Sequence, residues 1–140
     1  MTYRFQITLH MKNRIIIVDD DHVNNMMNSF FISRTLPDVD IVCFEQPYEA
    51  LEFLHDSANM EDDQIRNVIL LDINMPEING WDFLDEFEKM NPEVHKRYKI
   101  YLLSSSIDPG DIARAEANVF VEEFLSKPIT DTAVLKLFAA

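Results

Sequence analysis

The sequence predicts an α/β domain in which parallel strands alternate with helices. Short runs of consecutive apolar residues, such as 15–18 and 68–71, are typical of strands that are buried on both faces. Segments with helical spacing of apolar side chains separate these runs, and such alternation favours βαβ units and a parallel sheet. The length of 140 residues fits one domain.

The first predicted strand, residues 14–18, is rich in β-branched side chains. Asp19, Asp20 and Asp21 follow it directly. A strand buried on both faces cannot continue through three carboxylates, so we place them in the loop after the strand. Asp21 is a suitable N-cap for the next helix, which Pro37 ends.

The second strand is predicted over residues 39–44, and Pro47 suits the first turn of the helix that follows. Residues 57–66 are polar and acidic and are expected to form a loop. The third strand, residues 68–71, then leads into Asp72. This carboxylate therefore stands at the carboxyl end of a buried strand.

An amphipathic helix is expected over residues 80–90, and Asn91 with Pro92 is expected to end it. The fourth strand, residues 99–103, leads into three serines, of which Ser104 is the first. A turn then starts a short helix that is predicted to extend through residue 118.

The fifth strand is predicted over residues 119–125, and Thr130 caps a last helix. Five strands thus alternate with five helices. Right-handed crossovers place all the carboxyl ends of parallel strands at one edge of the sheet, where ligands bind in open α/β sheets. The side chains expected at that edge are Asp19, Asp20, Asp72, Ser104 and Lys127.

Composition and termini exclude several classes of protein. A net charge of −13 argues against a nucleic-acid-binding surface, and two glycines leave no Gly-rich phosphate loop. No apolar run approaches the length of a membrane span, no secretory signal is present, and Cys43 is the single cysteine. We therefore expect a cytoplasmic protein without membrane contact. Residues 1–13 alternate like a strand, but we favour a disordered or non-native leader before a domain of residues 14–140.

The acidic cluster has a predictable chemistry. Three neighbouring carboxylates repel one another unless a cation lies among them. An oxygen-only cluster selects a hard cation, and we predict Mg²⁺, which usually takes one or two carboxylates and keeps waters and a phosphate. With Lys127 and the hydroxyl of Ser104, the edge can hold a phosphoryl group, with one carboxylate as the nucleophile.

Four motifs follow the strands in order along the chain. They are Ile17-Val18-Asp19-Asp20-Asp21, the segment Leu70-Leu71-Asp72-Ile73-Asn74-Met75-Pro76 with Gly80, Leu103-Ser104-Ser105-Ser106, and Phe124-Leu125-Ser126-Lys127-Pro128. As a set they resemble the motifs of the receiver domains of bacterial response regulators. The resemblance implies a flavodoxin-like, doubly wound (βα)5 fold with strand order 2-1-3-4-5.

The resemblance also implies roles for individual residues. Asp72 would accept a phosphoryl group from a partner's phosphohistidine. Asp20, Asp72 and the backbone carbonyl of Asn74 would hold Mg²⁺, and Asp19 would act through a water. Lys127 would pair with the phosphoryl group.

Three further residues take their expected roles from the family. Ser104 would move to hydrogen-bond the phosphoryl group, and Phe124 would turn inward behind it. The Lys127–Pro128 peptide bond would be cis. Ser104 stands where the family often has threonine, and Phe124 where it often has tyrosine, so an aromatic hydroxyl is lost.

The expected function is that of a single-domain response regulator, a phosphoacceptor in a two-component phosphorelay and not an enzyme. Its partners would be a histidine kinase or histidine phosphotransfer protein and a downstream protein, and the chain itself would be a monomer or weak dimer. One alternative is a Mg²⁺-dependent small-molecule phosphohydrolase, although Asn74 stands where such an enzyme needs a second aspartate. The other is a binding module that keeps the fold and works without phosphorylation.

Overall fold

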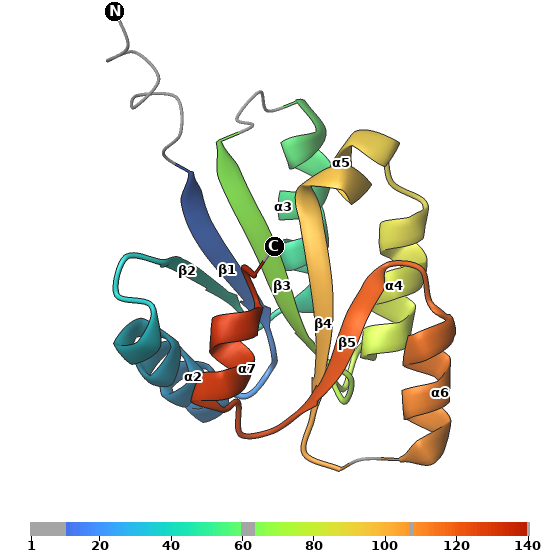
Figure 1. The fold of residues 1–140 in the computed structure, drawn as a ribbon. Coiled ribbons are helices and arrows are strands. Elements are labelled where there is room, and N and C mark those ends of the chain that lie inside the picture. Colours follow the sequence, from blue (N-terminus) through green and yellow to red (C-terminus); the bar gives the residue numbers. More distant parts are fainter. Residues whose placement is uncertain (1–10, 60–63, 107, 140) are drawn as a thin grey trace, which may run out of the picture.

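The computed structural model describes residues 11–59, 64–106 and 108–139. Within them, five parallel strands form one sheet in the order β2-β1-β3-β4-β5 (Figure 1). The strands are β1 (Lys12–Val18), β2 (Asp40–Phe44), β3 (Ile65–Asp72), β4 (Tyr98–Ser104) and β5 (Val121–Ser126). The predicted fold class and strand order are both confirmed.

Helices cover both faces of the sheet. On one face lie α2 (His22–Thr35) and α7 (Asp131–Lys136), which contact each other. The other face carries α3 (Pro47–Asp56), α4 (Gly80–Glu88), α5 (Pro92–Arg97) and α6 (Pro109–Ala117). None of the helices in the described parts of the chain is long and apolar enough to cross a membrane.

The side chains of the central strands point alternately to the two faces of the sheet and pack into a separate core on each face. In β1, Ile16 packs with α3 and α4 residues, whereas Ile15 and Ile17 pack with Ile32 of α2 and Leu137. Since successive side chains of a strand point to opposite faces, each must be apolar in a strand covered on both sides. This is the physical origin of the continuous apolar runs in the sequence.

Two strands begin earlier than the sequence predicts. β1 begins at Lys12, within the predicted leader, and β3 begins at Ile65, within the predicted loop of residues 57–66. These first residues pair only with each other, because Lys12 aligns with Ile65 and Asn13 with Arg66. Residues 1–10 of the predicted leader lie outside the described residues.

Within the described residues, two helices, α4 and α5, connect β3 to β4, where the sequence predicts one. Asn91 and Pro92 follow the end of α4 as expected, but they also start α5. Pro92 lies in the first turn of α5, and the Asn91 side chain accepts a hydrogen bond from the Glu93 N–H at 2.9 Å. β5 begins at Val121 rather than at residue 119, because the Asn118 side chain accepts the Phe120 N–H at 2.9 Å and holds a turn.

Candidate functional site

The carboxyl ends of four strands bring the predicted site residues together. Asp19 follows β1, Asp72 ends β3, Ser104 ends β4 and Lys127 follows β5. Carboxylate oxygens of Asp19, Asp20 and Asp72 all lie within 4.8 Å of one another. They border a shallow hollow of about 260 Å³, whose lining also includes Asp21, Asn24, Asn74, Ser105 and Lys127.

Lys127 joins two of the carboxylates. Its Nζ donates to Asp19 Oδ2 at 2.7 Å and lies 3.3 Å from Asp72 Oδ1. The Lys127 backbone N–H donates to the Ser104 carbonyl at 2.8 Å, which fixes the end of β5 against β4. The Lys127–Pro128 peptide bond is cis, the geometry implied by the family resemblance.

The loop after β1 is held in place by its own carboxylates. Asp19 Oδ1 accepts the Asp21 N–H at 2.9 Å, and the Asp19 carbonyl accepts a hydrogen bond from the Asn25 side chain at 2.8 Å. Asp21 Oδ1 in turn accepts the N–H groups of Val23 and Asn24, as predicted for the N-cap of α2. Asp20 is left exposed beside the buried Asp19.

Burial and charge shift two pKa values in the site. Burial, followed by the charge of Asp19, raises the pKa of Asp72 to about 6, against the opposing effects of Lys127 and the Asn74 N–H. Burial alone would lower the pKa of Lys127, but its hydrogen bond to Asp19 and the charge of Asp72 outweigh burial and raise this pKa. Lys127 and the Asn74 N–H therefore do not fully offset the cost of ionising the buried Asp72 carboxylate beside Asp19.

This cost of ionisation predicts a pH dependence of stability. A carboxyl group with a raised pKa stabilises the fold at low pH, and this contribution is lost as the pH rises through about 6. The unfolding free energy of the metal-free protein should therefore fall more steeply than that of Asp72→Asn between about pH 4 and 6, the interval from the ordinary to the raised pKa of Asp72. Urea denaturation of both proteins in a chelating buffer measures the difference, and parallel pH profiles would contradict the assignment.

The residues of the cluster fit a hard divalent cation. Asp19, Asp20 and Asp72 offer only oxygen ligands, which is the set that Mg²⁺ prefers. Because Lys127 and the Asp21 N–H engage both oxygens of Asp19, the exposed Asp20 and Oδ2 of Asp72 are better available to an ion. Asn74 lines the same hollow and donates its N–H to Asp72 Oδ1 at 3.3 Å.

The three serines at the end of β4 have different surroundings in the structure. Ser104 is buried, with 1% of its surface exposed, and its Oγ donates to the Ser106 carbonyl at 2.9 Å. Ser105, which the sequence analysis did not select, lines the acidic hollow. A serine run carries no signal that distinguishes its members, because the direction of each side chain depends on the backbone at the strand end.

Phe124 lies apart from the acidic hollow. It aligns with Leu102 of β4 and packs, half-buried, against the core on the α6 side of the sheet. There it borders a second hollow, of about 480 Å³, together with Ile112 and Ala115 of α6. The structure therefore places Phe124 beside α6, two strand positions before Ser126.

Gly80 supports the backbone of Asp72. A Cβ at position 80 would lie 2.9 Å from both the Asp72 carbonyl oxygen and the Ile73 Cα, closer than real Cβ contacts. Alanine there must displace the backbone that carries Asp72. We expect Gly80→Ala to lower the unfolding free energy by about 1–3 kcal/mol.

Gly110→Ala is the matched control in the same urea denaturation experiment. A Cβ at position 110 would meet only the Asp108 side chain, at 3.3 Å, and Gly110 lies in the first turn of α6. Alanine there should be tolerated, because a side chain can move more easily than backbone. Equal losses of stability in the two variants would refute the close approach at Gly80.

Comparisons with known proteins agree with this geometry. The family model for the response regulator receiver domain matches residues 15–139. A crystal structure of a two-component response regulator from Cytophaga hutchinsonii is 33% identical, with a TM-score of 0.79 over 91% of this chain and 95% of that one. A receiver protein structure from Dyadobacter fermentans is 26% identical, with a TM-score of 0.78 over 91% and 99% of the two chains. Response regulator Rcp1 of Synechocystis is 26% identical over 81% of this chain and 75% of its own length.

Proposed function

This chain belongs to the response regulator receiver domain family, and from that premise we propose that Asp72 is its phosphoacceptor. Membership of a two-component system implies a histidine kinase as partner. A histidine kinase or a histidine phosphotransfer protein would donate the phosphoryl group. The observation that carries the proposal is the convergence of Asp72, Lys127 and the carboxylates of Asp19 and Asp20 at one edge of the sheet.

The transfer itself needs few parts. A carboxylate oxygen of Asp72 bonds to phosphorus as the bond from phosphorus to the donor's imidazole nitrogen breaks, and that nitrogen keeps the electron pair. Asp20, Asp72 and the Asn74 carbonyl would hold Mg²⁺, with Asp19 acting through a water. When bound, this ion neutralises negative charge on the phosphoryl oxygens. Lys127 Nζ, 3.3 Å from Asp72 Oδ1, is placed to bind the same oxygens.

The switch requires Ser104 to change partners. The Ser104 Oγ, which donates a hydrogen bond to the Ser106 carbonyl in this structure, would rotate toward the phosphoryl group. The half-buried Phe124 would turn inward behind it. Charge-assisted hydrogen bonds contribute roughly 1.5–3 kcal/mol each. Two or three such hydrogen bonds supply the ~5.5 kcal/mol needed to move a two-state equilibrium from 1:99 to 99:1. The altered surface would then bind a downstream protein.

Helix α2 offers a docking surface for the phosphodonor. Val23, Met26, Met27 and Phe30 are exposed large apolar side chains on this one helix, and α2 begins directly after Asp21 of the acidic hollow. Methionine-rich apolar surfaces suit protein partners. A donor bound there would lie beside Asp72.

We expect Phe30→Ala to slow phosphotransfer at least about tenfold from a histidine kinase that phosphorylates the wild-type chain, because exposed aromatic side chains are frequent anchors of interfaces. Labelling by acetyl phosphate should stay unchanged, since this small donor needs no docking surface. Tyr48→Ala, which removes an exposed aromatic ring from α3, is the control. Equal slowing by both variants, or slower acetyl phosphate labelling in Phe30→Ala, would contradict this docking surface.

Incubation with acetyl phosphate and Mg²⁺, followed by intact-mass measurement, tests the proposed function. We expect one added phosphoryl group per chain, and none after chelation of Mg²⁺. Failure to form an adduct with acetyl phosphate and with every histidine kinase screened would favour the binding module instead. Continuous turnover of a phosphoester would favour the phosphohydrolase.

A further inference from the structure

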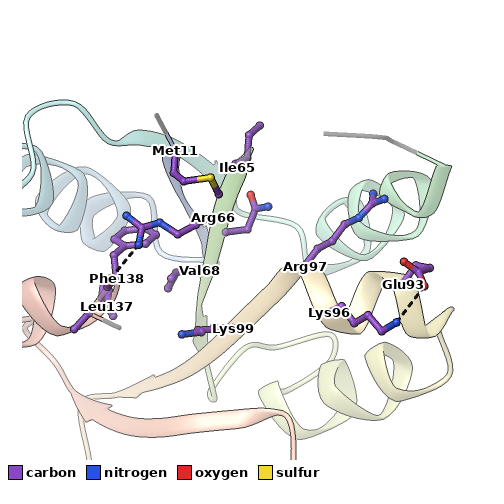
Figure 2. A pocket seen from close by; sticks show the side chains of 12 residues that line it. Met11, Ile65, Arg66, Val68, Glu93, Lys96, Arg97, Lys99, Leu137 and Phe138 are labelled. Carbon is purple, nitrogen blue, oxygen red and sulfur yellow. Dashed lines mark hydrogen bonds and ion pairs between the residues drawn. The ribbon is translucent and has the colours of Figure 1, made fainter. Parts of the chain in front are cut away.

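A hollow of about 410 Å³ lies at the opposite edge of the sheet from Asp72. The starts of β3 and β4, α5 and the chain after α7 surround it (Figure 2). This size falls in the range of small-molecule sites, roughly 300–1,000 Å³. The acidic hollow around Asp72 is smaller and lies at the other end of the same strands, so the two sites are separate.

The hollow is basic in an acidic protein. Arg66, Lys96, Arg97 and Lys99 line it, and they are four of the 12 basic residues in a chain of net charge −13. Among the described residues of the lining, Glu93 is the one acidic residue, which leaves a local charge of +3 (four minus one). Such a reversal of sign favours an anion over a cation in this hollow.

The four basic side chains differ in the partners that they already have, and only Lys96 has a charged one among the described residues. Lys96 pairs with Glu93 at 3.3 Å, and Arg97 donates to the Ser57 carbonyl. Arg66 donates from Nε to Asn13 Oδ1 at 2.9 Å and from Nη1 to the Phe138 carbonyl at 3.4 Å, and its guanidinium lies 5.7 Å from the centre of the Phe138 ring. Lys99 has no hydrogen bond or ion pair within the described part of the chain, and Figure 2 shows its amine on the side of Leu137 and Phe138.

Apolar side chains form one side of the hollow. Val68 and Leu137, both almost fully buried, line it together with Phe138. All three belong to the core under α2 and α7, so they lie on one face of the sheet.

We propose that this hollow binds a small organic anion that carries an apolar or aromatic body. The acidic group binds between Lys99 and Arg66. The body packs against Val68, Leu137 and Phe138. Nothing in this proposal depends on phosphorylation of Asp72.

Anilinonaphthalene sulfonate is a probe with an acidic group and an aromatic body, and phenylnaphthylamine is its neutral counterpart without the sulfonate. Nuclear magnetic resonance titration of the full chain should shift the backbone amides of residues 65–68, 97–99 and 137–138. The Kd of the sulfonate should rise roughly three- to fivefold in Lys99→Gln, since one exposed cation is lost. The Kd of the neutral probe should stay the same in that variant.

Two control variants separate the site from general charge and from unfolding. Lys89→Gln removes an exposed lysine from the end of α4 and should leave the Kd unchanged, whereas Lys99→Arg should restore tight binding. Amide shifts confined to the exposed apolar residues of α2 would overturn the proposal. An unchanged Kd of the sulfonate in Lys99→Gln would also overturn it, as would equal affinity of the wild-type chain for the two probes.

Discussion

Asp72→Asn is expected to abolish phosphorylation, both from acetyl phosphate and from a histidine kinase. The side-chain amide has nearly the shape of the carboxylate, but its oxygen is not a nucleophile that forms a stable bond to phosphorus. Asp72 is 5% exposed and lies 3.3 Å from Lys127 Nζ, so the loss is expected even though the other two carboxylates of the cluster remain. Intact-mass measurement after incubation with Mg²⁺ and the donor reads the effect directly.

Asp85→Asn is the matched control for this loss. Asp85 is an exposed aspartate of α4, outside the acidic hollow, so the same substitution there should leave the yield of adduct unchanged. A phosphoryl adduct that persists in Asp72→Asn at the wild-type yield would remove Asp72 from the role of acceptor. Loss of the adduct in both variants would point to a general effect of charge.

Lys127→Gln is expected to destabilise the protein by about 3 kcal/mol at pH 8, because it removes the cation from two buried carboxylates. The 2.7 Å hydrogen bond to Asp19 and the 3.3 Å pair with Asp72 are both lost. The effect should shrink at pH 5, where Asp72, whose pKa is raised to about 6, is mostly protonated. Urea denaturation in a chelating buffer at the two pH values measures both parts of this prediction.

The same variant should also separate phosphorylation from switching. Asp72 remains in Lys127→Gln, so an adduct can still form, but the phosphoryl group loses its contact with the ammonium group. Binding of a downstream protein should then respond less to phosphorylation.

Lys89→Gln is the matched control for the stability measurement. It removes an exposed lysine from a surface pair with Glu86, and stability should change by less than about 0.5 kcal/mol. A similar change in both lysine variants would contradict a structural role for Lys127.

The sequence predicts this fold well because its signals are local and agree with one another. Continuous apolar runs such as residues 15–18 and 68–71 occur where β1 and β3 are covered on both faces. The Asp21 and Thr130 caps also lie where the pattern predicts them. The carboxyl-end rule for parallel strands then brings Asp19, Asp72 and Lys127 together without any information on distance.

The features that the sequence does not predict depend on contacts between distant segments. Helix α5 has one buried residue, Val94, and so lacks the apolar stripe that marks a helix. The partner of the Ser104 hydroxyl depends on the backbone path of Ser106. The basic hollow was also missed, because Arg66 and Lys99 lie on different strands of a chain whose overall charge is strongly negative.

Identification of the phosphorylated residue tests the central claim most directly. Borohydride reduces an acyl phosphate to an alcohol and releases phosphate, so a phosphorylated aspartate becomes homoserine. The chain would be phosphorylated with acetyl phosphate and Mg²⁺, reduced with borohydride, digested, and analysed by peptide mass spectrometry. Our account predicts homoserine at position 72 and at no other aspartate. Homoserine at Asp19, Asp20 or Asp21 instead would contradict it.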